Sequence, residues 1–313
     1  MFSTKGKDRL YEAKFGVFNH YLGATHVGLQ GGRGEEWNAL IEKADIKSLA
    51  ESIAKTSAGY YFITIMQRGR YMLAPNAAFD QIAGTKPGEA CPKRDIIPEL
   101  AEELKKRGID LYLYYTGDGP FKDEQIGPKF GLTHHAKDVI TNSYVQKWAS
   151  VLEEYSLRYG SDVKGWWIDG CYRKLGFTDE QLELYVKAAK KGNPDAVVSM
   201  NNGLNSTLVK QHPSEDFTAG EFEDFVYVPD RRFFDGAQAH ILAPLGVSHD
   251  PEKPGLAWCM PGVKYDAEYM TDYIKRCNNA GCVVTLDIYI DKNFNLDNKQ
   301  TELLHKVRKN IGR

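Results

Sequence analysis

The sequence predicts a single-domain α/β fold in which residues 1–313 form a (β/α)8 TIM-like barrel. Eight short runs rich in β-branched and aromatic residues occur along the chain, and a helical pattern or a long loop separates each run from the next. No proline-rich linker, low-complexity tract or residue-level repeat divides the chain. A length of 313 residues fits one barrel of eight βα units.

The predicted strands show the hydrophobic patterns typical of buried strands. In chain order they cover residues 15–21, 60–66, 110–115, 165–169, 196–201, 217–221, 237–242 and 282–288. In a closed parallel barrel every strand points its carboxyl end toward the same mouth. Polar residues at these ends are therefore expected to face one shared site.

Two helices are predicted with clear boundaries. The segment 143–159 repeats apolar residues at steps of three and four behind a cap at Ser143, and this apolar stripe should dock on the barrel wall. The segment 95–107 begins with Asp95 as a cap, carries basic residues in its last turn, and is ended by Gly108.

The stretch 222–259 is the least regular part of the pattern. It is rich in Gly, Pro and Asp, which favour turns and loops. We therefore expect the sixth and seventh crossover helices to be short or replaced by loops.

Composition excludes several kinds of partner. The 40 basic and 42 acidic residues give a net charge of -2, so no nucleic-acid partner is expected. No apolar run is long enough for a signal peptide or a membrane span, so no membrane partner is expected. The five cysteines include no Cys-x-x-Cys pair and should be free thiols. These features favour a cytoplasmic protein, or a periplasmic or secreted one if an export signal has been removed, and leave the oligomeric state open.

Two carboxylates are the main catalytic candidates. The apolar strand 165–169 ends in Asp169, although an Asp-Gly pair after a strand also serves as a turn or a helix cap. Glu221 ends the later predicted strand 217–221. Glycosidic cleavage uses such a pair, in which one carboxyl group attacks or activates water and the other protonates the leaving oxygen. We expect Asp169 to be the nucleophile and Glu221 the acid/base.

The segment around Glu221 holds several other acids, so the identity of the acid/base stays open. The rival residues are Glu215, Asp216, Glu223 and Asp224. Several of these must be solvated surface charges. Glu221 is preferred because it stands at the end of a predicted strand.

Further polar and aromatic residues near predicted strands are candidates for substrate binding, through hydrogen bonds to hydroxyl groups or stacking on a sugar ring. They are His20, Gln67, Tyr115, Trp167, Asn202, Asp235, His240 and Asp287, with Asn201 beside Asn202 at the same strand end. Side chains alternate across a strand, so one of Trp166 and Trp167 should face inward and the other outward.

No metal and no cofactor are expected. His134 and His135 are adjacent and do not easily present both rings to one ion, and no third ligand is near them in sequence. The glycine-rich segment 31–34 lacks the strand-turn-helix context and the lysine of a phosphate-binding loop.

Four segments resemble the α-L-fucosidase family of retaining glycosidases. Residues 14–21, Lys-Phe-Gly-Val-Phe-Asn-His-Tyr, are similar to the family's first-strand pattern Lys-Phe-Gly-Ile-Phe-Ile-His-Trp-Gly. Residues 167–170, Trp-Ile-Asp-Gly, resemble its nucleophile motif Trp-Phe-Asp-Gly. Residues 216–221 resemble its Gly-Asp-Phe-x-Thr-Pro-Glu segment, and residues 280–287 resemble its late Gly-Gly-Asn-Leu-Leu-Leu-Asn segment.

The resemblance implies a retaining exo-α-L-fucosidase with Asp169 as nucleophile, Glu221 as acid/base, and an oligosaccharide or glycoside as substrate. At residues 66–70, Met-Gln-Arg-Gly-Arg replaces the family's His-His-Asp-Gly-Phe, which removes two histidines that the family uses around fucose. The sequence stops soon after the predicted barrel, whereas larger members of the family continue into a C-terminal β-sandwich, so we expect a compact, divergent branch. The alternatives are a glycosidase of this fold that acts on another sugar or inverts, and a catalytically inactive barrel that binds carbohydrate.

Overall fold

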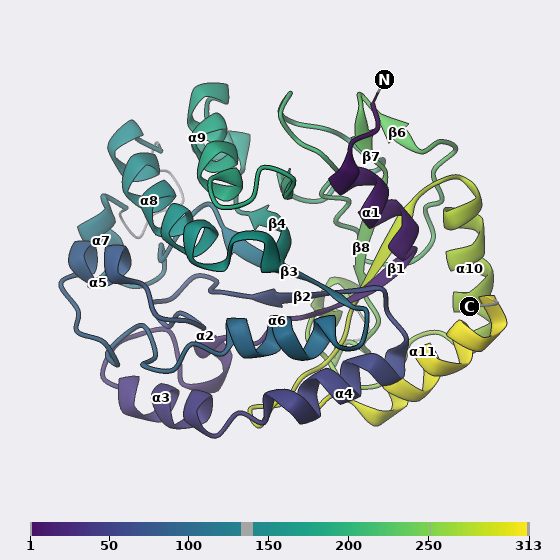
Figure 1. The fold of residues 1–313 in the computed structure, drawn as a ribbon, viewed down its shortest axis with the longest axis horizontal. Coiled ribbons are helices and arrows are strands. Elements are labelled where there is room, and N and C mark those ends of the chain that lie inside the picture. Colours follow the sequence, from purple (N-terminus) through teal and green to yellow (C-terminus); the bar gives the residue numbers. More distant parts are fainter. Residues whose placement is uncertain (1, 133–139, 251, 312–313) are drawn as a thin grey trace.

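The main feature of the fold is a parallel β-sheet. A computed structural model describes residues 2–132, 140–250 and 252–311, and within them the sheet has seven strands in the order β5-β4-β3-β2-β1-β9-β8 (Figure 1). The strands are β1 (Phe15–Asn19), β2 (Tyr60–Thr64), β3 (Asp110–Thr116), β4 (Val163–Asp169), β5 (Val197–Met200), β8 (His240–Pro244) and β9 (Val283–Asp287). This α/β architecture is consistent with a TIM-like barrel.

The predicted sixth strand, 217–221, is not a regular strand. It forms isolated parallel bridges, Phe217 with Gln238 and Glu221 with Leu242, and the amide of Asp216 donates to the carbonyl oxygen of Val198 on β5 at 2.8 Å. The segment 216–222 therefore lies between β5 and β8 without completing a regular ladder. Closure into eight strands stays a prediction.

The predicted strand 237–242 is divided in two. Its first part, β7 (Ala237–Gln238), pairs antiparallel with β6 (Phe233–Phe234), and its second part is β8. Between residues 222 and 266 the described chain contains this small hairpin, β8 and the 3-10 turn η3 (Pro254–Ala257). The expectation of a loop is confirmed for the sixth crossover, but it is wrong for the seventh, because the 13-residue helix α10 (Ala267–Asn279) connects β8 to β9.

Helices cover the outside of the strands (Figure 1). They are α1 (Lys5–Ala13), α2 (Gly23–His26), α3 (Gly34–Glu42), α4 (Ile46–Thr56), α5 (Ala77–Ala83), α6 (Ile97–Lys105), α7 (Gly127–Phe130), α8 (Asn142–Tyr159), α9 (Asp179–Lys190), α10 (Ala267–Asn279) and α11 (Asn298–Ile311), with short 3-10 turns η1 (Gly160–Asp162) and η2 (Arg173–Leu175). The apolar stripe of α8 is buried, as its spacing predicts.

The predicted caps of two helices shift by one or two residues. Thr141, and not Ser143, caps α8, because its side chain accepts the amide of Tyr144. The N-cap of α6 is Ile96, although the carboxylate of Asp95 still accepts the amide of Ile97 at 3.1 Å. Both corrections keep the helix where the sequence places it.

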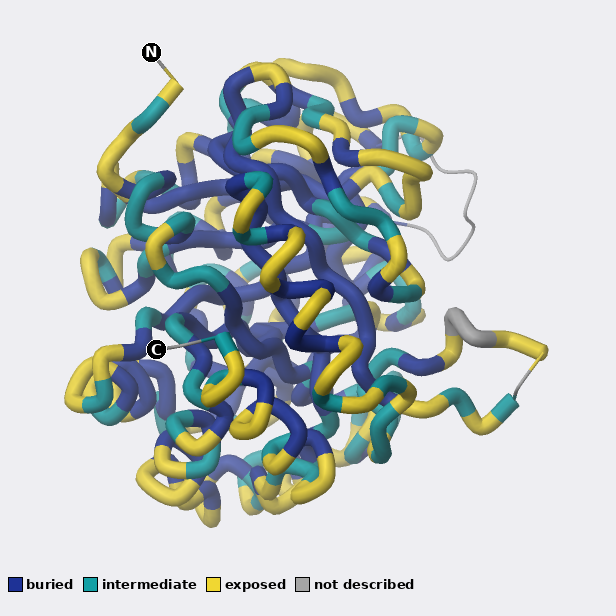
Figure 2. Tube along the Cα trace, turned by 90° about the vertical axis from the view of Figure 1, so that its right-hand side faces the viewer, coloured by how far each residue is buried: buried dark blue, intermediate teal, exposed yellow. Residues whose placement is uncertain are grey.

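Burial separates the strand side chains into two clusters. One lies among the strands and includes Tyr112, Tyr114 and Trp167, and the other packs strands against helices and includes Tyr115 and Trp166. Figure 2 shows the buried chain in the interior and exposed positions around it. The alternation predicted for the paired tryptophans is confirmed, with Trp167 facing inward.

The end of the sheet opposite the strand carboxyl ends is covered by α1. Leu10 of this helix joins the inner cluster, and Lys7 donates to the carbonyl oxygen of Gly236 at 2.9 Å. Among the described residues, none of the helices combines the length and apolar character that a membrane span needs.

Candidate active site

A pocket of about 270 Å³ opens at the carboxyl ends of the strands. Its position matches the site expected for a parallel barrel. It is lined by Phe18, His20, Leu22, Thr25, Gln67, Arg68, Tyr114, Trp167, Asp169, Tyr172, Glu221, Leu242, Trp258 and Cys259. The two predicted catalytic carboxylates and three predicted binding residues, His20, Gln67 and Trp167, thus meet in one cavity.

Asp169 is the last residue of β4 and is held by three hydrogen-bond donors. The hydroxyl of Tyr114 and the amide of Gln67 donate to its Oδ2 at 2.6 and 3.2 Å, and the amide of Asn201 donates to its Oδ1 at 2.8 Å. Such charge-assisted hydrogen bonds fix the orientation of the carboxylate. This environment suits a nucleophile that must be correctly oriented.

Glu221 receives one side-chain hydrogen bond, from Asn201, whereas Asp169 receives three. Burial and the negative charge of Asp169 raise the pKa of Glu221 to about 7, against a hydrogen bond from Asn201 and the charge of His20, which lower it. A carboxyl group with such a pKa is protonated below neutral pH and can donate a proton to a leaving oxygen. The two carboxyl groups therefore have environments suited to different roles.

Asn201 connects the two carboxylates. Its Nδ2 donates to Asp169 Oδ1 at 2.8 Å and to Glu221 Oε2 at 2.5 Å, while its Oδ1 accepts the amide of Gly203 at 3.0 Å. The two carboxylate oxygens cannot lie further apart than the sum of the first two distances. That limit falls within the roughly 5 to 5.5 Å of retaining glycosidases and below the roughly 6.5 to 9.5 Å of inverting ones.

The acids that rival Glu221 occupy other positions. Glu215 is buried and accepts the amides of Met200, Gln211 and His212, so it anchors a turn. Asp216 pairs with Lys190 at 2.6 Å. Glu223 and Asp224 are absent from the pocket lining.

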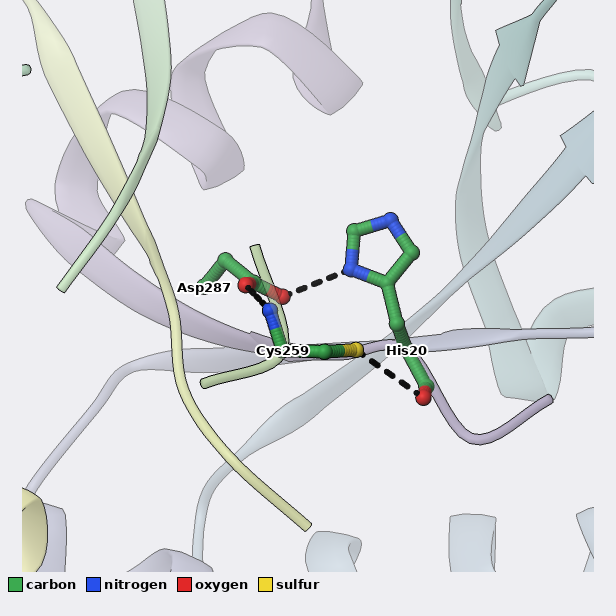
Figure 3. Close-up of side chains that lie close together, drawn as sticks. All are labelled: His20, Cys259 and Asp287. Carbon is green, nitrogen blue, oxygen red and sulfur yellow. Dashed lines mark hydrogen bonds and ion pairs between the residues drawn. The ribbon is translucent and has the colours of Figure 1, made fainter. Parts of the chain in front are cut away.

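His20 forms part of the pocket wall with two partners behind and beside it (Figure 3). Its Nδ1 lies 2.7 Å from Asp287 Oδ1, and the other oxygen of Asp287 accepts the amide of Cys259 at 2.7 Å. Burial alone would lower the pKa of His20, but Asp287 and Cys259 raise it to about 10. The ring is therefore a cation at neutral pH.

The comparison with protein families identifies the chain. Residues 74–233, which include both candidate carboxylates, match the family model described as Alpha-L-fucosidase. The chain belongs to the α-L-fucosidase family. No curated protein sequence matches it significantly.

Solved structures share the fold of this α-L-fucosidase-family chain at low sequence identity. An endo-fucoidan hydrolase of glycoside hydrolase family 107 has a TM-score of 0.69 at 15% identity, covering 97% of this chain and 94% of that one. An α-L-fucosidase from Bacteroides thetaiotaomicron has a TM-score of 0.66 at 15% identity, covering 98% and 73%. The α-L-fucosidase AlfC from Lactobacillus casei, in complex with its α-L-fucose product, has a TM-score of 0.65 at 16% identity, covering 98% of each chain. Family and fold together make the chain a glycoside hydrolase whose substrates are carbohydrates.

In the segment that resembles the family pattern His-His-Asp-Gly-Phe, Met66 and Gln67 stand at the two histidine positions and Arg68 follows them. Gln67 contacts Asp169 directly, and Arg68 lines the pocket with a positive φ of 69°. Arg70 anchors this loop, because it pairs with the buried Asp123 at 2.5 Å. The side chains of Gln67 and Arg68 therefore form the part of the pocket wall beside the candidate nucleophile Asp169.

Several predicted binding residues of the α-L-fucosidase-family chain lie outside the pocket. Tyr115 points outward and donates to the carbonyl oxygen of Trp148 at 2.9 Å, so its neighbour Tyr114 faces the site. Asn202 lines a small adjacent cavity, and its Oδ1 accepts the amide of Arg173 at 2.8 Å. Their binding roles stay predictions, which the geometry does not favour.

His240 and Asp235 are placed further from the carboxylates. His240 lies in the interior, between Thr285 Oγ1 at 2.6 Å and the carbonyl oxygen of Thr218 at 3.0 Å, and burial lowers its pKa to about 4. Asp235 sits in the turn of the β6–β7 hairpin. Asp287 reaches the site indirectly, through His20.

Nine lining residues were not predicted from the sequence: Phe18, Leu22, Thr25, Arg68, Tyr114, Tyr172, Leu242, Trp258 and Cys259. For Tyr114, strand alternation puts it on the same face of β3 as Tyr112 and opposite Tyr115, but alternation alone does not say which face is the inner one. Trp258 and Cys259 come from an irregular loop in which no periodic pattern points to the site. His134 and His135, the adjacent pair that the sequence does not favour as metal ligands, lie outside the described residues.

Proposed function

We propose that the protein is a retaining exo-α-L-fucosidase in which Asp169 is the nucleophile and Glu221 the acid/base. The observation that carries this proposal is the amide of Asn201, which bonds both carboxylates and so limits their separation. A separation in this range leaves room for a sugar carbon between the groups but not for an intervening water molecule.

The first step transfers the sugar to the enzyme. A carboxylate oxygen of Asp169 attacks the anomeric carbon, the glycosidic bond breaks, and protonated Glu221 gives its proton to the departing oxygen. Tyr114 and Gln67 hold the attacking carboxylate. The products of this step are a glycosyl ester at Asp169 and the free leaving group.

The second step releases the sugar. Glu221, now ionised, takes a proton from water as that water attacks the anomeric carbon, and the ester bond to Asp169 breaks. Two displacements at one carbon restore the original configuration. Both carboxyl groups return to their starting protonation states.

The size of the pocket supports cleavage of a terminal sugar. Its volume of about 270 Å³ is below the roughly 300 to 1,000 Å³ of sites that enclose drug-sized ligands. Aromatic side chains of Phe18, Tyr114 and Trp167 line it beside the polar groups and can pack on an apolar sugar face. We further propose that segment 216–222 completes the barrel and that residues 1–313 form one catalytic domain.

The test is hydrolysis of para-nitrophenyl α-L-fucoside beside a panel of other para-nitrophenyl glycosides. Asp169→Asn should lower kcat by roughly a thousandfold or more while the protein stays folded. Asp272→Asn, which changes an exposed acid on α10, is the matched control and should retain the wild-type rate. Near-normal turnover by Asp169→Asn would overturn the nucleophile assignment.

The stereochemistry is tested separately by proton NMR of the first-formed product. Retention predicts that α-L-fucose appears before its mutarotation to the β anomer. If the β anomer appears first, the enzyme inverts and Asp169 acts as a base. Release of a different sugar from the panel would keep the two-carboxylate chemistry and change the substrate.

A further inference from the structure

Three side chains with metal-binding atoms meet in the wall of the pocket. His20 follows β1, Cys259 lies in the loop after η3, and Asp287 ends β9, so distant parts of the chain bring them together. The nitrogen, sulfur and oxygen ligand atoms all lie within 4.8 Å of one another (Figure 3). Imidazole, thiolate and carboxylate are the donors that Zn²⁺ takes in proteins.

The cluster is organised by its own hydrogen bonds. Asp287 receives the Cys259 amide on Oδ2 and lies 2.7 Å from His20 Nδ1 through Oδ1, so one buried carboxylate orients both other residues. Cys259 also adopts a φ of 59°, a left-handed conformation that non-glycine residues rarely take unless the surroundings impose it. This backbone conformation places the thiol beside His20, whose carbonyl oxygen lies 3.3 Å from Sγ.

We propose that His20, Cys259 and Asp287 form a binding site for a thiophilic divalent cation such as Zn²⁺, and that the bound cation blocks the sugar pocket. On binding, the Cys259 thiol releases its proton and becomes a thiolate, and His20 releases the proton on Nδ1 so that its lone pair reaches the metal. Both protons pass to solvent. Small shifts of the side chains bring the three donors to bonding distance, and water fills the remaining coordination position.

The cation would occupy the pocket wall and not a remote surface. His20 and Cys259 line the same cavity as Asp169, whereas Asp287 lies behind them. The open coordination position therefore faces the space that the sugar uses. Mg²⁺ and Ca²⁺ prefer shells of oxygen ligands and should not compete at a site with a thiolate. The blocking effect rests on the proposed function, but cation binding does not.

The first experiment measures binding without any substrate. Chelator-treated protein is titrated with Co²⁺, whose bond to a thiolate gives a charge-transfer absorption band, and then with Zn²⁺ as competitor and by calorimetry. We expect one equivalent to bind, and Cys259→Ser to abolish the band and to weaken Zn²⁺ binding by at least the roughly tenfold to hundredfold that loss of an outer-shell partner costs. His305→Ala removes an exposed histidine of α11 outside the cluster and should match wild type.

Stability of the variants is checked by thermal unfolding, and Cys259→Ala serves as a second ligand deletion if Cys259→Ser folds poorly. Unchanged Zn²⁺ affinity in the folded Cys259 variants, or equal binding of Mg²⁺, would overturn the site.

The second experiment adds Zn²⁺ to the hydrolysis assay. Inhibition reversed by chelator and absent in Cys259→Ser supports blocking, and tight binding without inhibition overturns it. If no glycoside is hydrolysed at all, the proposed function fails while the titration still decides the metal site.

Discussion

At the scale of single residues, the pocket holds two carboxyl groups in contrasting surroundings. Asp169 receives three side-chain hydrogen bonds and Glu221 receives one, and burial together with the charge of Asp169 raises the Glu221 pKa to about 7. Environments that separate two titratable groups in this way commonly define an acid and a nucleophile. The amide of Asn201 donates to both carboxyl groups, so it couples the position and the charge of one group to those of the other.

The role of Asn201 leads to a prediction about pH dependence. The hydrogen bond from Asn201 stabilises ionised Glu221 and lowers its pKa, so removing it in Asn201→Ala should raise that pKa further. The basic limb of kcat/KM, which lies near the pKa of the general acid, should move to higher pH. Asn202→Ala, whose side chain contacts Arg173 instead, is the control for the position of the limb. A limb that stays in place in Asn201→Ala would show that another group sets it.

At the scale of elements, strand ends bring together residues that are distant in sequence. Hydrophobic alternation locates strands because the period is a property of the backbone, and it therefore placed Asp169 and Glu221 correctly near one mouth. It did not define which of two adjacent residues faces inward. Tyr114 instead of Tyr115 faces the pocket because the pairing of β3 with β4 sets the face, and that pairing is a tertiary property.

The sequence pattern also could not predict how deep a strand residue lies below the pocket, or where an irregular loop lies. His240 begins β8 and so lies deeper than the pocket, although Leu242 on the same strand reaches it. The loop that carries Trp258 and Cys259 has no period, and contacts with β1 and β9 fix its position. Such contacts exist only once the chain has folded.

The irregular segment 216–222 depends on Gly220. This residue has a φ of 61°, and a Cβ atom there would clash with the carbonyl oxygen of His240. Gly220→Ala should therefore lower stability by about 1 to 3 kcal/mol beyond the backbone strain, and it should lower kcat because it displaces the adjacent Glu221. Chemical denaturation and steady-state kinetics measure the two effects.

A matched glycine separates steric conflict from backbone strain. Gly84, at the end of α5, has a φ of 72° and nothing within 4 Å of an added Cβ atom. Gly84→Ala should show the strain alone, with unchanged kcat. Equal loss of stability in the two variants would mean that the close approach of segment 216–222 to β8 contributes nothing to the cost.

At the scale of the whole molecule, the interior contains several buried acids. Burial raises the pKa values of Asp118, Glu215 and Glu221 to about 7, and the charge of Asp169 adds to this effect at Asp118 and Glu221. Each group takes up its proton more readily in the folded chain than in the unfolded one. The stability of the fold is therefore linked to pH through its core as well as its surface.

The sign of this linkage can be tested with Asp118. Its pKa rises from 3.8 to about 7 on folding, so between these values the folded state holds a proton that the unfolded state has lost. The stabilisation from this bound proton is complete at lower pH. Through this window its loss lowers the free energy of unfolding by about 1.4 kcal/mol for each unit that the pH rises. Asp118→Asn carries no such proton, so its stability relative to wild type should increase from about pH 5 to about pH 8. Urea unfolding at both pH values measures the change, with Asn202→Ala as a control that alters no ionisable group. A constant difference between Asp118→Asn and wild type would mean that Asp118 stays ionised in the folded protein, and the polar groups around Thr116 would then have to offset its burial.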